Sequence, residues 1–561
     1  MAKSKKSTKG YVIRILISAV LIFLDFYVTL PPINPRSSAF WTFFITCLFI
    51  VVIVNFFTTI TEAIQNFAGG QRVRTGDDTV VHIQHNRKFT LADFGMPVVI
   101  AGATVLVIIV LSLVVSFIGI PFFQSKNYRD LITVEDGDFT ADVAELSMNS
   151  IPVVDRDSAM RLGSRKLGEM STLISQFEID AHYTQINYQG EPYRVTPLMY
   201  ADTIKWFYNV KEGLPAYITV NMVTQETELV WLEEGMKYSD SEYFFRDINR
   251  YLRFKYPTKI FYNVSFEIDE EGTPYWIAPT VTYKVGWWNG SDIQGAVLVN
   301  AVTGECKYYS VEEVPTWVDQ LYPAELIMTQ LNQNGLYING YWNSIFGQKN
   351  VRQTSEGYNY LAIDDDVYLY TGMTSVLSDE SNIGFILTNM RTKETKYYSV
   401  PGATEYSAME SAKGQVQHLN YNATFPLLVN VSGRPAYFIS LKDAAGLVKM
   451  YAYVDVEQYQ VVGTGATVRE ARNNFAALMQ SEDVEIPEGE VTSVSGTVAA
   501  ISQVVIEGNS YYYFLLDGDT NVYTAHINVS VDLPFVQIGD SVTVEYTEGA
   551  ELRSVTMIKR N

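Results

Sequence analysis

The sequence predicts a membrane protein of mixed α+β class, with three N-terminal transmembrane helices, a large extracellular α+β repeat region and a small C-terminal β-barrel. Three observations predict it. Three long apolar stretches crowd the first 123 of the 561 residues. A seven-residue motif then recurs at offsets of 79 and 89 residues. The C-terminal residues alternate apolar and polar side chains in short runs between glycine-containing turns.

Residues 1–123 are expected to form the membrane anchor. The apolar stretches at 11–30, 40–60 and 97–120 can each cross a hydrocarbon core of about 30 Å at roughly 1.5 Å per helical residue. A cleaved signal peptide has a single apolar run of about 7–15 residues, whereas two further spans follow here. We therefore expect the first span to be retained.

Basic residues predict the orientation of this anchor, because they favour the cytoplasmic side. They precede the first span and occur again in the loop 61–96: Lys3, Lys5, Lys6, Lys9, Arg72, Arg74, Arg87 and Lys88. The short loop 31–39 has only Arg36. The N-terminus and the loop 61–96 are therefore expected in the cytoplasm of a multi-pass plasma-membrane protein, with everything after residue 123 outside.

Charge is unevenly divided between the anchor and the outer region. The first 123 residues hold ten Lys and Arg against five acids, a net of +5, so the remainder of the −21 chain carries −26. A surface this acidic repels phosphate backbones and anionic lipid headgroups, which argues against a nucleic-acid partner. Cations, cationic peptides and neutral glycans remain compatible with it.

The two cysteines predict a fold without an internal disulfide. Cys47 lies in the second span and Cys306 in the outer region, so the two cannot pair within one chain. An exported region of this size without disulfides suits a bacterial surface. Its length predicts two or more domains.

A repeated motif organises the outer region. Val-Asn-x-Val-Thr-x-Glu occurs at 220–226 and 299–305, a related Thr-Asn-x-x-Thr-x-Glu at 388–394, and a degenerate copy at 454–460. An alternating strand before each motif and a Tyr-rich strand after it predict β-hairpins. Helical patterns are expected to follow these strands and pack on their sheets, at 242–254, 323–331, 404–416 and 467–479. The many tyrosines fit half-buried sheet faces, or alternatively a platform for sugars or peptides.

The hairpin Val-Asn-x-x-Thr-Gly-Glu at 299–305, flanked by an amphipathic helix, resembles the PepSY-type unit of bacterial surface proteins and peptidase propeptides. The resemblance covers 195–480, and family members usually carry Asp where this chain has Asn221, Asn300 and Asn389. The whole arrangement is similar to uncharacterised membrane-anchored proteins of Gram-positive bacteria. It implies α+β repeats at 195–480 after a juxtamembrane α+β segment at 124–194, and no established activity.

The C-terminal residues 490–561 follow a polar linker at 481–489 and resemble an OB-like barrel of five short strands. Nucleic-acid OB-folds combine basic grooves with aromatic side chains, whereas this segment has few cations besides Arg553, Lys559 and Arg560. A structural cap or a protein-binding barrel is therefore expected. Asp517-Gly518-Asp519 is expected to form a hairpin turn.

Motifs for catalysis, cofactors or metals are missing, including H-E-x-x-H, C-x-x-C, G-x-S-x-G, a Walker A loop and a dinucleotide glycine fingerprint. We therefore expect no enzyme, no cofactor and no metal ion. His82 and His85 fit a solvated loop better than a metal site, because Arg87 and Lys88 flank them. Asp364 to Asp366 fit a solvated acidic bend better than a calcium site, because consecutive strand residues alternate faces.

Three residues are candidates for contact with a partner: Asp25, Trp287 and Trp288. A carboxylate within a membrane helix is costly, so Asp25 marks a helix contact, or it reaches the outer headgroups nearby. Trp287 and Trp288 precede Asn289-Gly290, a hairpin-turn signal that puts both indoles at a loop end. They fit a contact with a glycan, a partner or the outer leaflet, or packing onto a neighbouring unit.

These observations predict a binding or scaffold module at the cell envelope, integral to the membrane and with a protein partner there. The alternative is a regulator or inhibitor of an envelope peptidase, which the PepSY-like units imply. A third hypothesis is a subunit of a transport or envelope-synthesis complex.

Overall fold

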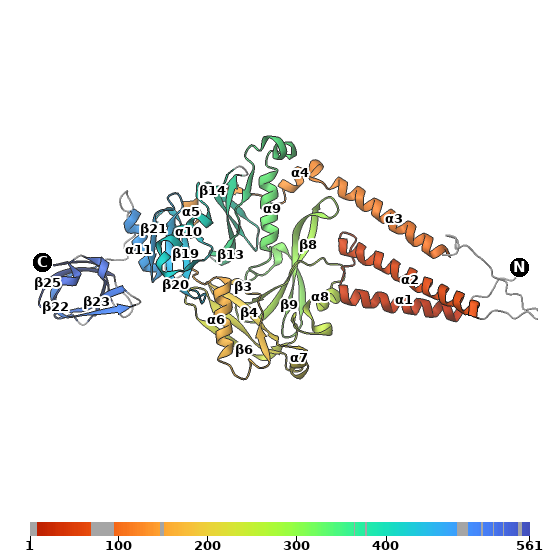
Figure 1. Ribbon diagram of the computed structural model, residues 1–561, viewed down its shortest axis with the longest axis horizontal. Helices are drawn as coiled ribbons and strands as arrows, with labels where there is room; N and C mark the ends of the chain where they lie inside the picture. Colours follow the sequence, from red (N-terminus) through yellow and green to blue (C-terminus); the bar gives the residue numbers. More distant parts are fainter. Residues whose placement is uncertain are drawn as a thin grey trace, which may run out of the picture. The chain divides into compact units, whose positions relative to one another are not determined.

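The structure, a computed structural model, describes residues 8–68, 95–145, 151–363, 365–375, 378–479, 492–506, 509–519, 521–530, 532–547 and 553–560. These residues form a mixed α+β protein, which confirms the predicted class (Figure 1). The chain divides into two compact units, Met1–Leu478 and Met479–Asn561. The predicted linker 481–489, residues 69–94 of the predicted cytoplasmic loop with His82 and His85, and Asp364 lie outside the described residues.

Three long apolar helices begin the first unit: α1 (Thr8–Thr29), α2 (Ser38–Ala68) and α3 (Gly95–Ile118). Two of them contain windows long and apolar enough to cross a membrane, Val12–Thr29 and Ile100–Ile118. The window found in α2, Ser38–Val54, is shorter. Apolar side chains of α1 and α3 point outward, as Val28 (74 % exposed) and Leu113 (66 %) show, which is the arrangement expected of helices that face lipid.

A short segment leads from α3 to the sheets. It contains α4 (Pro121–Arg129), β1 (Glu135–Asp136) and α5 (Phe139–Asp142). Proline at the first position of α4 suits a helix start, and the Asp138 side chain caps α5 by accepting from the backbone N–H groups of Thr140 and Ala141. β1 then pairs in parallel with β15 of the third sheet.

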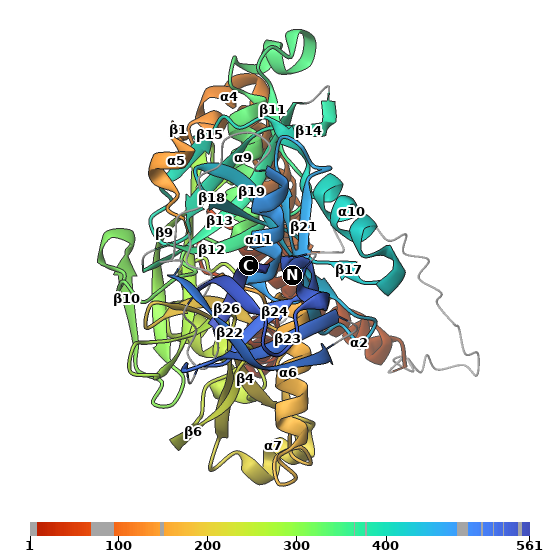
Figure 2. The ribbon, with the colours of Figure 1, turned by 90° about the vertical axis from the view of Figure 1, so that its left-hand side faces the viewer.

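Four sheets follow, all of them antiparallel apart from β1 (Figures 1 and 2). The first contains β2 (Phe177–Ile179), β3 (Thr184–Tyr188), β4 (Glu191–Tyr200), β5 (Leu214–Asn221) and β6 (Thr227–Met236). The second contains β7 (Ser265–Ile268), β8 (Pro274–Val285), β9 (Asn289–Asn300) and β10 (Cys306–Ser310). β4 runs across the boundary expected at 195, because the first sheet already begins at Phe177.

The third sheet contains β1, β11 (Arg352–Thr354), β12 (Asn359–Ile363), β13 (Asp366–Ser375), β14 (Ser378–Asn389), β15 (Thr395–Tyr398) and β16 (Gly402–Ala403). The fourth contains β17 (Asn422–Ala423), β18 (Leu427–Val431), β19 (Arg434–Lys442), β20 (Val448–Asp455) and β21 (Val462–Gly465).

A helix stands before each sheet: α6 (Arg156–Gly168), α8 (Ile248–Lys255), α9 (Ala324–Leu336) and α10 (Glu405–Gln415). α6 packs on β5 and β6, and α10 packs across β17, β19, β20 and β21. In these two cases the helix covers the sheet that follows it, whereas the sequence pattern placed helices after their sheets. Only α11 (Val468–Met479) comes after its sheet, with Phe475 against Gly463 of β21.

The four motif segments lie at turns between antiparallel strands. Asn221, Asn300, Asn389 and Asp455 end β5, β9, β14 and β20. In each turn the side-chain Oδ1 accepts hydrogen bonds from the backbone N–H groups two and three residues further on, at 2.7 to 3.0 Å. Asn and Asp favour such turns because their short side chains replace a backbone acceptor.

One large hydrophobic core joins the second and third sheets. Ile277 and Leu298 of the second sheet and Leu369 and Ile386 of the third pack with Ile327 of α9. All five side chains are at most 5 % exposed. Because α9 contributes to this core, its N-terminus is held between the two sheets.

The second unit is a small barrel. Strands β22 (Thr492–Ile506), β23 (Asn509–Leu516), β24 (Tyr523–His526), β25 (Ser541–Thr547) and β26 (Arg553–Arg560) close in the order β22-β23-β24-β26-β25. The pair β24–β26 is parallel and the others are antiparallel. Asp517 and Gly518 form the turn after β23, and Asp519 accepts hydrogen bonds from Tyr523 and Arg553, both at 2.6 Å.

Candidate functional site

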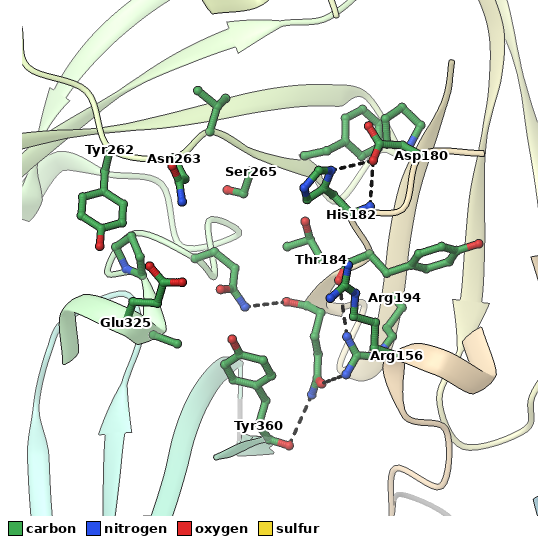
Figure 3. A pocket seen from close by; sticks show the side chains of 18 of the residues that line it. Arg156, Asp180, His182, Thr184, Arg194, Tyr262, Asn263, Ser265, Glu325 and Tyr360 are labelled. Atoms are coloured by element: carbon green, nitrogen blue, oxygen red, sulfur yellow. Dashed lines mark hydrogen bonds and ion pairs between the residues drawn. The ribbon is translucent and has the colours of Figure 1, made fainter. Parts of the chain in front are cut away.

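A cavity of about 850 Å³ opens among the first three sheets (Figure 3). Residues from the first turns of three helices reach its wall: Arg156 of α6, Asn249 of α8 and Glu325 of α9. Helix N-termini carry partial positive charge and free N–H groups. The fold therefore brings the first turns of three helices to the wall of one open cavity.

Two arginines line this cavity. Arg194, on β4, is only 6 % exposed. It donates to the Tyr183 carbonyl oxygen at 3.4 Å and to Gln185 Oε1 at 3.3 Å. Among the described residues, its Nε has no hydrogen-bond partner and its guanidinium has no salt bridge. Burial lowers the pKa of Arg194 to about 10, so the group is still a cation at neutral pH.

The second arginine, Arg156, is the first residue of α6. Its guanidinium donates to the Ala181 carbonyl oxygen at 2.8 Å. The neighbouring Asp155 is the N-cap of α6 and pairs with Lys442 of the fourth sheet at 2.6 Å. These contacts hold the cationic wall in place from two sheets.

Acidic residues form another part of the wall. Asp180, His182 and Asp240 have ligand atoms within 4.8 Å of one another, and Asp180 Oδ1 lies 2.7 Å from His182 Nδ1. Burial among the atoms of the cavity wall, together with the nearby Asp180 carboxylate, raises the pKa of Asp240 to about 7. The two carboxylates and the imidazole are donors that suit a divalent cation or an ammonium group.

Buried carboxyl groups support the wall from behind. Glu267 of β7 is fully buried and accepts from the backbone N–H of Asp319 at 2.9 Å and of Gln320 at 3.2 Å. Asp319 accepts from the N–H of Asn187 at 2.6 Å, which ties the segment before α9 to β3 of the first sheet. Burial raises the pKa of Glu267 to about 7 and that of Asp319 well above its ordinary value.

The sequence-predicted contact residues lie elsewhere, at the junction of the long helices with the sheets. Trp287 and Trp288 both donate to the Pro35 carbonyl oxygen, at 3.0 and 3.2 Å, in the loop between α1 and α2. Arg253 of α8 donates to the Leu30 carbonyl oxygen at 2.9 Å. The hairpin tip that the sequence identified is thus in contact with the chain's own helix connection.

Asp25 lies within α1 and its side chain is partly exposed. Its Oδ2 is buried without a hydrogen-bond partner among the described residues. Asp366 of the predicted acidic bend pairs with Arg391 through contacts of 2.7 and 2.8 Å. The structure therefore brings none of the sequence-predicted contact residues to the cavity.

Sequence reasoning missed the cavity residues. His182 is one of five dispersed histidines, and Asp240 lies 58 residues further along the chain. Arg194 is a single cation within a strand pattern. Only the packing of three sheets around α6, α8 and α9 brings these side chains together. No family model matches the chain, and no curated protein matches it.

Proposed function

We propose that this chain is a three-span membrane protein whose acidic outer region binds a small ligand in the central cavity, and that it acts by binding and scaffolding. The ligand carries an anionic group, a carboxylate or a phosphate, which contacts Arg194. Its cationic part, where it has one, contacts Asp180 and Asp240. A protein partner in the envelope would bind the outer surface of the ligand-bound protein.

One observation carries this proposal: a buried cation that makes no salt bridge within the part of the chain that the structure describes lines a cavity large enough for a ligand. An unpaired buried charge is costly, and proteins rarely retain one without use. An anion next to Arg194 removes this cost. The helix N-termini at the same wall add to the attraction.

The repeat and barrel assignments are part of the same proposal. Four units, each a helix followed by an antiparallel sheet, have the same side-chain-capped turn, which supports PepSY-like repeats. The strand order of the C-terminal barrel, with its parallel β24–β26 pair, supports an OB-like fold. The basic loops on either side of the spans and the length of α2 support three crossings.

The test is a thermal-unfolding series on the full chain in detergent, with sodium phosphate, acetate and tri-alanine as probes. A ligand at about 100 times its dissociation constant adds about 2.7 kcal/mol to the free energy of unfolding. We expect at least one anionic probe to raise the melting temperature of the wild type and to leave that of Arg194→Met unchanged.

Arg472→Met, on α11 away from the cavity, is the matched control and should keep the response. Phosphate and acetate without tri-alanine would identify a simple anion, and tri-alanine alone would identify a zwitterion. An equal response in Arg194→Met would contradict binding at this wall.

A further inference from the structure

The largest exposed aromatic side chains of the first unit, outside the long helices, gather near the ends of those helices. Phe207, Tyr208, Phe244, Trp342 and Phe346 are each between 61 and 77 % exposed. They belong to α7 (Thr203–Asn209), the 3₁₀ helix η2 (Phe244–Arg246) and the π-helical turn η4 (Asn343–Gly347) with the residue before it. Exposed aromatic groups in this number mark an interaction surface.

Ring contacts connect this surface to the long helices. From α3, Phe117 contacts Phe123, Phe123 contacts Phe122, and Phe122 contacts Trp342, with ring centroids 4.8 to 5.6 Å apart. Trp342 then stacks on Phe346 at 5.8 Å. The surface around η4 is thus a continuation of the apolar surface of α3.

A second set of ring contacts starts from α1. Tyr27 contacts Phe245 of η2 at 5.8 Å, and Phe244 contacts Trp206 of α7 at 5.9 Å. Phe244 has φ +55°, a left-handed conformation that is strained for a side chain of this size. The Arg250 guanidinium holds it by donating to its carbonyl oxygen at 2.7 Å. Figure 1 shows α8 and α4 beside the ends of α1 and α3.

The segments that carry these rings are basic. We name them the membrane-facing rim: residues 119–129, 203–211, 243–259, 284–290 and 341–352. Together they contain twelve Lys and Arg and one Asp, a net of +11. Residues 124–561 carry −26 in total, so the remainder of this region carries −37. The acids directly next to these segments, Asp130, Asp202, Glu212 and Glu242, reduce the net charge to +7, so the rim is basic within an otherwise acidic region.

We propose that the membrane-facing rim lies in the headgroup layer of the outer leaflet, with its aromatic rings at the acyl boundary. Its exposed lysines lie on anionic phospholipid headgroups: Lys126, Lys211, Lys255, Lys284 and Lys349. Aromatic side chains favour this layer, and each basic side chain near an anionic bilayer surface contributes about 1 kcal/mol. The inference rests on the proposed membrane anchor, because the long helices set the level of the bilayer. The rim fixes the orientation of the cavity above the membrane.

The test uses the full chain in liposomes of phosphatidylcholine, with and without phosphatidylglycerol. Phe207→Cys and Phe346→Cys are each made in a Cys47→Ser, Cys306→Ser background and labelled with an environment-sensitive fluorophore. Tyr406→Cys on α10, an exposed aromatic position outside the rim, is the matched control. We expect blue-shifted emission at 207 and 346, loss of most of it on adding spin-labelled lipid, and a larger effect with phosphatidylglycerol. Position 406 should show none of these changes.

Hydrogen exchange on the unsubstituted chain provides a second measurement where a cysteine variant does not fold. Amides of 203–209 and 343–347 should exchange more slowly in anionic liposomes than in detergent, and those of 405–415 should not change. Water-like emission at 207 and 346 in a chain that has inserted would overturn the rim and leave the anchor intact. Shielding without quenching by spin-labelled lipid would overturn it in favour of contact with a second copy of the chain, the only protein in the liposomes. Equal lipid quenching at 406 would overturn the anchor geometry itself.

Discussion

The carboxyl group of Glu267 lies wholly inside the protein and makes its contacts with two backbone N–H groups and the Ser265 hydroxyl. Burial raises its pKa from 4.5 to about 7. A carboxyl group whose pKa is higher in the folded state destabilises that state as it ionises. The contribution of the protonated Glu267 to the free energy of unfolding is therefore present at low pH and is lost as the pH rises from about 4.5 to about 7.

We expect the full chain in detergent to unfold at a lower denaturant concentration at pH 8 than at pH 5.5. Glu267 accounts for about 2 kcal/mol of this loss, because the interval from pH 5.5 to its folded-state pKa of about 7 spans about 1.5 units at 1.36 kcal/mol per unit. Burial also raises the pKa of Asp319, which acts in the same direction. Urea titrations across this range measure the effect.

Glu267→Gln should flatten the pH profile, because an amide does not ionise. Glu271→Gln, an exposed side chain near the turn between β7 and β8, is the matched control and should follow the wild type. A profile of Glu267→Gln as steep as that of the wild type would contradict this account.

At the scale of elements, the four turns show what the sequence could and could not predict. The motif located each turn, because Asn or Asp followed by Thr, with Glu at the end, records a local hydrogen-bond pattern. The sixth motif position has positive φ in three copies, in Gln225, Gly304 and Lys393. At Gly304 a Cβ would also clash with the Tyr238 ring, which explains why this copy has glycine.

The sheet on which each helix packs was harder to predict from the sequence than the position of the turns. A helical pattern between two groups of strands is compatible with either sheet, and the amphipathic pattern does not distinguish them. Contacts between residues distant in sequence, such as those of α10 with β19 to β21, determine which sheet the helix covers. The cavity residues were hidden for the same reason, because they are brought together from three sheets.

Asn300→Ala should destabilise the second sheet by about 1–2 kcal/mol, because it leaves the N–H groups of Val302 and Thr303 without their acceptor. Asn300→Asp should keep most of the stability, because Asp455 makes the same two hydrogen bonds in the fourth sheet. Hydrogen exchange at residues 301–306 of the full chain measures both. Equal protection in the alanine and aspartate variants would contradict the role of the side chain.

At the scale of the whole molecule, the net charge of a region does not show how its charges are distributed over the surface. The net charge of −26 over residues 124–561 argues against contact with anionic lipid, whereas the basic segments of the rim lie near the ends of the long helices. Composition alone does not reveal this separation, because residues 119–129 and 341–352 are far apart in sequence and are connected through Phe122 and Trp342. The rim follows from the fold.

The proposed three-span topology leads to a prediction for intact cells. Basic residues before α1 and between α2 and α3 favour the cytoplasm, and the Leu30 to Pro35 connection contacts Arg253 and Trp287 of the outer region. Both observations put the α1–α2 connection and the sheets on the same side. Protease added to protoplasts should therefore degrade the region after residue 123 and spare the loop 61–96. In inverted vesicles the same protease should cleave the loop and spare the barrel. A barrel protected in intact protoplasts would contradict the topology, and the contacts at Pro35 would then require both sides of the junction to lie in the cytoplasm.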